Sequence, residues 1–182
     1  MERNIRLNKI YIIRLLVILV LVSALVIMRK IETGFLIYSN GANVLDMRFG
    51  YSASDVFQLF TTLGAEGRSI YVKYLLDDFI FTVVFAIVQN YILKFIMGKA
   101  VLNSKWHVLL YIAYLRAFFD VIENIIILIL LNSFPSMLLS LITAASSVTR
   151  LKFIVYGIWI LTVPISLVVR LIMRKKAKVG VI

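Results

Sequence analysis

The chain has 182 residues, of which 62% are hydrophobic and 16% are charged, and its mean hydropathy of +0.99 excludes an ordinary soluble domain. Twenty Lys and Arg against nine Asp and Glu give a formal net charge of +11, and the lack of cysteine excludes disulfides, thiolate metal sites and cysteine nucleophiles. In so apolar a chain we assign the basic excess to membrane topology and contact with anionic lipid, so no nucleic-acid partner is expected.

Four apolar stretches are long enough to cross a bilayer, which takes about twenty residues of helix. They cover residues 10–28, 70–95, 106–131 and 151–172. The first follows a basic N-terminal segment, but it is longer than the core of a signal peptide and is expected to remain as an anchor. The sequence therefore predicts an all-α integral membrane four-helix bundle, with residues 1–182 forming a single domain.

The distribution of Lys and Arg predicts the orientation of this bundle. Basic residues gather near the N-terminus, in the connection between the second and third stretches, and in the C-terminal tail. Fewer of them flank the other two connections, although Arg29 and Lys30 oppose the trend. The positive-inside rule then predicts a multi-pass plasma-membrane protein with both termini in the cytoplasm, most simply in a bacterial cytoplasmic membrane.

The first outer connection, residues 29–69, is long enough to hold structure of its own. Apolar residues at helical spacing predict an interfacial amphipathic helix, capped by Ser54 or Asp55 and ended by Gly64. The apolar positions are Val56, Leu59, Phe60 and Leu63. Before the fourth stretch we expect a bend or a separate short helix, because one helix from Ser136 to Lys175 would be about 60 Å long.

Charged residues interrupt the second and third stretches, and their spacing indicates a shared interior. A charge at mid-bilayer costs at least about 2.5 kcal/mol, so such residues need partners or water. Residues three or four apart lie on one helix face, and the last three stretches each carry a polar stripe at that spacing. We expect these three helices to turn their stripes inward and the first helix to pack outside them. The charged residues are Asp77, Asp78, Arg116, Asp120 and Glu123; the stripes continue through Thr82, Phe85 and Gln89 and through Tyr156, Trp159 and Ser166.

Two interpretations of the buried charges stay open. Arg116 with Asp120, and Lys152 with Asp78 or Glu123, could form ion pairs that only fix helix register. Alternatively, the charges line a water-accessible pocket that binds, and in a stronger form of the hypothesis transports, a small or lipid-like ligand. The candidate ligand-binding residues are Asp78, Asp120, Glu123, Asn124, Arg116, Lys152, Arg68, Tyr71, Tyr74 and Thr149.

Other classes of function follow from the same residues. A lipid-modifying enzyme could use Asp78 or Glu123 as acid or base and Arg68 or Lys152 to hold a phosphate. An accessory subunit could dock a membrane-protein partner with its polar stripe. We favour the non-enzymatic pocket, assign no catalytic residue, and expect no cofactor.

A metal site is also not predicted. The sole histidine, His107, lies about 24 Å along the third helix from Glu123, too far to complete a histidine-carboxylate site at the acidic residues. A site for a hard cation, made by the carboxylates and Asn124, remains an alternative.

Short motifs run through residues 45–160: LGxxGRxxY at Leu63–Tyr71, then Asp78, then FDxxEN at Phe119–Asn124 and TxxK at Thr149–Lys152. This pattern resembles a group of small, mostly bacterial four-span membrane proteins of unassigned activity. The resemblance implies that the motif residues belong together, and it implies no chemistry. The layout is also similar to that of EXPERA-domain proteins, which bind sterol-like amines with acidic residues inside a small bundle, but an analogy of fold does not carry function.

Overall fold

The computed structural model describes residues 2–102, 104–136 and 138–179, and all of the regular structure in these ranges is helical, as the sequence predicts. The described residues form four α-helices joined by two short 3₁₀ helices, η1 and η2. The elements are α1 (Glu2–Tyr38), η1 (Leu45–Met47), α2 (Ala53–Leu102), η2 (Lys105–Leu110), α3 (Tyr111–Ser133) and α4 (Leu139–Val179).

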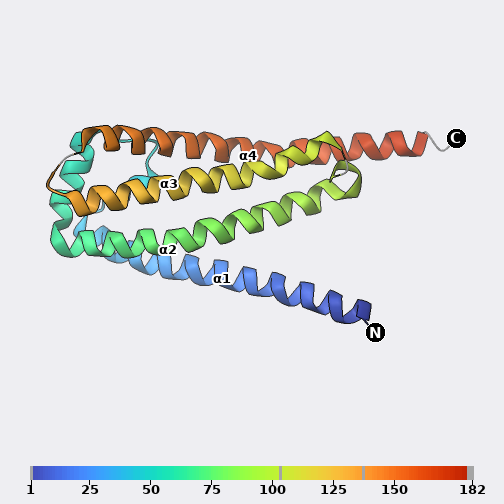
Figure 1. Ribbon diagram of the computed structural model, residues 1–182, viewed down its shortest axis with the longest axis horizontal. Helices are drawn as coiled ribbons and strands as arrows, with labels where there is room; N and C mark the ends of the chain where they lie inside the picture. Colours follow the sequence, from blue (N-terminus) through green and yellow to red (C-terminus); the bar gives the residue numbers. More distant parts are fainter. Residues whose placement is uncertain (1, 103, 137, 180–182) are drawn as a thin grey trace.

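The four helices lie lengthwise beside one another (Figure 1). α2 packs against α1, α3 and α4, and α3 packs against α4. α2 and α4 run in the same direction, α3 runs opposite to them, and α1 diverges from α2 toward its N-terminal end (Figure 1). We call the end covered by residues 39–63 the capped end, and the end where η2 joins α2 to α3 the η2 end.

Three helices are long and apolar enough to cross a membrane, which supports a membrane protein. The qualifying segments are Ile12–Tyr38, Ala53–Gly98 and Leu139–Met173. Among the described residues α3 does not qualify by composition, because Arg116, Asp120 and Glu123 interrupt its 23 residues.

The helices are longer than several of the expected spans, and three differences affect how the bundle is built. α1 continues past Arg29 to Tyr38, helped by an ion pair between Arg29 and Glu32 (2.9 Å), so the first connection is shorter than expected. α3 begins at Tyr111, because residues 105–110 form η2. Of the two alternatives before the fourth span, a bend or a separate short helix, the separate helix is wrong, because α4 is continuous from Leu139; it contains Pro164.

The amphipathic helix predicted before Gly64 is present as residues 53–63 and lies across the capped end (Figure 1). Its N-cap is Ser52, rather than Ser54 or Asp55 as predicted. The Asp55 carboxylate accepts a hydrogen bond from the Ser52 amide (2.7 Å), and the Asp55 amide donates to the Ser52 hydroxyl (3.2 Å), which is a capping-box arrangement. Gly64 ends this helix with φ 60°. The predicted apolar face is buried: Val56, Leu59, Phe60 and Leu63.

Most of the apolar core lies at the capped end. Phe35 of α1, Leu45 of η1 and Ile127 of α3 are all fully buried there, together with the helix over residues 53–63. A second, smaller core near the η2 end consists of Leu93, Met97 and Val101. The capped end therefore holds the first connection firmly against the bundle, and this positions the site described next.

Candidate ligand-binding site

Lys152 of α4 is the centre of a buried charge cluster. Its Nζ lies 2.6 Å from a Glu123 carboxylate oxygen and 3.0 Å from an Asp120 oxygen, both on α3. It also donates to the backbone carbonyl of Asp46 in η1 (2.8 Å). One ammonium thus joins the last helix, the third helix and the first connection, and uses all three of its donors.

Asp120 receives further support from its own helix and from α2. The Arg116 guanidinium pairs with one Asp120 oxygen, and the Thr82 hydroxyl donates to the same oxygen (2.5 Å). The guanidinium also stands over the Phe85 ring, with its carbon 5.0 Å from the ring centroid. All the polar residues here are buried, so the Asp120 charge is balanced by direct partners rather than by solvent.

The two remaining acidic residues of the predicted stripe have different partners. Glu123 accepts a hydrogen bond from the Thr149 hydroxyl. Asp78 accepts one from the side-chain amide of Asn124 (2.7 Å). Of the ion pairs that the sequence left open, Arg116 with Asp120 and Lys152 with Glu123 are present, whereas Asp78 bonds to an amide.

Asp46 belongs to this cluster, although it was not among the residues predicted from the sequence. Tyr71 donates to the Asp46 carboxylate (3.2 Å) while accepting from the Leu45 amide (2.9 Å), which holds η1 inside the bundle. Burial raises the pKa of Asp46 from 3.8 to about 6, although Lys152 acts in the opposite direction. The available signal was a lone acidic residue within the apolar run from Val44 to Met47.

A cavity of about 320 Å³ opens beside the cluster and is lined by all four helices and η1. One side is polar and the rest is apolar or aromatic. The polar side includes Asp46, Asp78, Arg116, Asp120 and Lys152. The apolar and aromatic lining includes Leu25, Met28, Met47, Tyr74, Phe81, Phe85, Phe153 and Tyr156.

As predicted, the first helix packs on the outside of the other three, against α2, but it also contributes to the wall of this cavity. Leu25, Met28, Arg29 and Glu32 of α1 form part of its wall. Leu25 and Met28 belong to the expected span, whereas Arg29 and Glu32 lie in the part of α1 that extends beyond it.

Several candidate residues lie behind the cavity or away from it. Glu123, Asn124, Thr149 and Tyr71 are buried and do not line it. Arg68 donates to the Phe60 carbonyl (2.9 Å) and stands 4.8 Å over the Phe134 ring. It therefore braces the corner after Gly64 and is not at the cavity mouth. Asp77 is half-buried and takes no part in the cluster.

The charges around the cavity do not cancel. Arg29 pairs with Glu32, and Arg116 and Lys152 pair with Asp120 and Glu123. Among the described residues, the carboxylates of Asp46 and Asp78 are in no ion pair. The cavity therefore has two acidic groups in excess, both on its polar side. Within the same residues, no group of three or more His, Asp or Glu is arranged to hold a metal ion.

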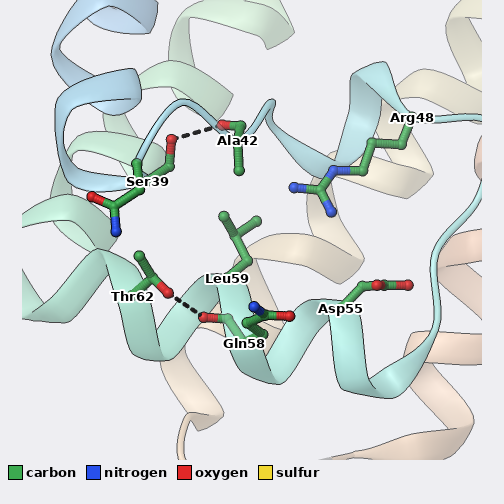
Figure 2. A pocket seen from close by; sticks show the side chains of 8 residues that line it. Ser39, Ala42, Arg48, Asp55, Gln58, Leu59 and Thr62 are labelled. Atoms are coloured by element: carbon green, nitrogen blue, oxygen red, sulfur yellow. Dashed lines mark hydrogen bonds between the residues drawn. The ribbon is translucent and has the colours of Figure 1, made fainter.

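A second hollow, of about 290 Å³, lies within the connection at the capped end. Figure 2 shows its lining, with the Arg48 side chain directed toward the helix over residues 53–63. Arg48 donates twice to the Asn43 carbonyl (2.6 and 3.1 Å), and Ser39 donates to the Ala42 carbonyl (2.7 Å). These polar groups bind the connection to itself, so we assign this hollow to the packing of the loop.

No protein-family model, no curated protein and no solved structure matches this chain, so the site is interpreted from its own geometry.

Proposed function

We propose that this chain is a four-span protein of the plasma membrane, most simply a bacterial cytoplasmic membrane, with both termini in the cytoplasm and the capped end outside. α3 is the span that composition alone does not support. Its 23 residues give about 34 Å of helix, enough to cross the hydrocarbon core. Its charged residues are buried within the bundle, while Leu115, Phe118 and Ile125 are exposed on its outer face. A helix with that distribution can stand in lipid.

We propose that the cavity binds a small or lipid-like ligand with a positively charged headgroup. The observation that carries this proposal is the pair of carboxylates, Asp46 and Asp78, that line the cavity without a basic partner among the described residues. A buried unpaired carboxylate is costly, and a cationic group between the two would offset that cost. A neutral or anionic headgroup would gain nothing comparable.

The remaining lining supports an apolar tail on the ligand. Leu25 and Met28 of α1 face the cavity from one side, and Phe153 of α4 faces it from another. Aliphatic and aromatic walls of this kind favour a hydrocarbon chain. In this arrangement the ammonium lies between Asp46 and Asp78, and Asn124 holds the Asp78 carboxylate in position through its amide.

The polar stripe faces the interior of the bundle, which favours this internal site over the accessory-subunit hypothesis. A docking stripe would lie on the outside of the bundle, whereas Asp78, Asp120 and Lys152 are buried within it. Glu123, one candidate acid of the enzyme hypothesis, is bonded to Lys152 and Thr149 behind the cavity.

The test compares three probes with the same tail: decylamine, decanol and decanoate. Purified protein in a non-ionic detergent is heated with each probe, and Tm is recorded. Decylamine should raise Tm of the wild type in a saturable way, and the other two should not. Asp78→Asn should lose the shift, while Asp77→Asn, the neighbouring residue outside the cavity, should keep it. An equal shift with decanol, or a full shift in Asp78→Asn, would refute the proposed ligand class.

A further inference from the structure

Two buried polar side chains and one buried ring nitrogen, toward the η2 end, have no hydrogen-bond partner among the described residues. Gln89 of α2 is 0% exposed, and both its amide oxygen and its amide nitrogen are unpartnered. Ser166 of α4 is also 0% exposed with an unpartnered hydroxyl. Trp159 is half-buried, but its indole nitrogen is buried and has no partner either. We call these three residues the lower stripe. Helices in lipid rarely retain buried polar groups without a bound guest or a function.

The lower stripe continues the polar side of the cavity along the interface between α2 and α4. Thr82 and Lys152 both contact Asp120, so they lie at the same level. Because α2 and α4 run in the same direction (Figure 1), seven further residues on each helix bring Gln89 and Trp159 about 10 Å closer to the η2 end. The rings of Phe85 on α2 and Tyr156 on α4 lie between these two levels, with their centroids 6.5 Å apart. This contact supports the alignment of the two helices.

The stripe also has a defined beginning and end. Tyr156 lines the cavity, and its ring is stacked on that of Trp159, with centroids 6.2 Å apart. Ser166 lies seven residues beyond Trp159. One turn farther, Arg170 donates to the Ile96 carbonyl (2.8 Å), at the break in α2 before Gly98. The unpartnered groups thus lie between the cavity and a basic residue at the η2 end.

We propose that water occupies the lower stripe and connects the cavity with the η2 end, so that protons reach the cavity from the side opposite the ligand. This inference rests on the proposed function. It implies that the site releases its cationic ligand when a proton arrives, rather than storing the ligand. A proton that arrives through the water chain converts the Asp78 carboxylate to its acid. The carboxylate then no longer balances the cationic headgroup, which leaves with its own charge intact. Water supplies donors and acceptors to all three members of the stripe, and an apolar guest could not.

The absence of native cysteine allows a direct test. Ser166→Cys is nearly isosteric, and Leu167→Cys places a thiol at the same depth on a side chain that is 46% exposed toward the surroundings of the bundle. Both proteins are placed in lipid vesicles and treated with Ag⁺, and the thiols left unmodified are counted by mass after denaturation. Thiolate forms only where water is present, so Ser166→Cys should react at least about tenfold faster than Leu167→Cys. The rate at which Gln89→Cys reacts with Ag⁺ gives a second measurement, again compared with Leu167→Cys.

Equal rates at Ser166→Cys and Leu167→Cys, with both proteins folded, would show a dry interface and overturn the inference. If Ser166→Cys does not fold, the Gln89→Cys rate decides in the same way. The assay uses Ag⁺ alone and no amine. If the interface is dry but decylamine still raises Tm, the water path is refuted and the proposed binding site is not.

Discussion

The charge cluster near the capped end and the stretch of α2 and α4 toward the η2 end differ in how far their buried polar groups are partnered. In the cluster, Asp120, Glu123 and Lys152 pair with one another, and a large apolar core lies at the same end, although single polar atoms of Tyr51 and Asn124 have no partner among the described residues. Toward the η2 end the core is small, and Gln89 and Ser166 are buried without partners among the described residues. The difference indicates that stability is concentrated at the capped end. The η2 end retains polar groups whose cost folding alone does not offset.

The largest expected effect comes from removing the cation that joins the capped end. Lys152→Met leaves Asp120 and Glu123 with an uncompensated buried charge, and we expect a loss of about 3–5 kcal/mol in the free energy of unfolding. Denaturant titration in detergent measures it. Lys73→Met removes an exposed lysine of α2 and should change stability little. The double variant Lys152→Met with Glu123→Gln should recover part of the loss. Similar losses in both single variants would mean that the cluster does not stabilise the capped end.

A core substitution at the capped end should have a comparable but smaller effect. Phe60→Ala removes a ring that is 1% exposed, and a loss of about 3 kcal/mol is expected. Phe57, on the same short helix, is 48% exposed, so Phe57→Ala should lose less than about 1 kcal/mol. The same titration compares the two. If both substitutions cost equally little, the helix over residues 53–63 does not pack on the bundle in solution.

The pH dependence of stability should report Asp46. Its pKa is raised by burial from 3.8 to about 6, so between these values the folded protein binds more protons than the unfolded chain. The stabilisation from protonated Asp46 is then complete below pH 4 and is lost as pH rises through about 6. Asp46→Asn should remove this decline and raise Tm at pH 7 by a few degrees relative to the wild type. Parallel Tm curves for the two proteins between pH 4 and 7 would contradict the assignment.

The smallest expected effect is on stability when a buried amide is replaced by leucine, and we expect it to differ between the two ends. Gln89→Leu replaces an amide without protein partners by an apolar group of similar size, so stability should rise by about 1 kcal/mol or stay unchanged. Asn124→Leu also replaces a buried amide, but it removes the hydrogen bond to Asp78 and should lower stability. Differential scanning fluorimetry of the pair is sufficient. Destabilisation by Gln89→Leu as large as that by Asn124→Leu would remove the contrast between the two ends.

Sequence periodicity predicted what depends on the faces of continuous helices. The apolar face from Val56 to Leu63, the inward direction of Asp78, Asp120 and Glu123, and the pairing of Arg116 with Asp120 are all present. These features follow from residues three or four apart on one helix, which the chain displays directly.

The features that were missed depend on the path of the chain in space. Asp46 enters the cluster because the first connection folds back into the bundle, and no repeat in the sequence encodes that contact. Arg68 follows the chain around the Gly64 corner and binds the Phe60 carbonyl there. Hydropathy alone also undervalues α3, because it counts Asp120 as a penalty whether or not Arg116 and Lys152 neutralise it.

The bond from Lys152 to the Asp46 carbonyl spans 106 positions of the chain, and it has a consequence for biosynthesis. When the ribosome has released only the first two helices, the segment carrying Asp46 has no ammonium to receive its carbonyl, and η1 has no third or fourth helix to lie against. Packing of η1 into the bundle must therefore wait for the last helix. A nascent chain stalled before residue 152 should leave that segment open to added protease, and completion of the chain should protect it.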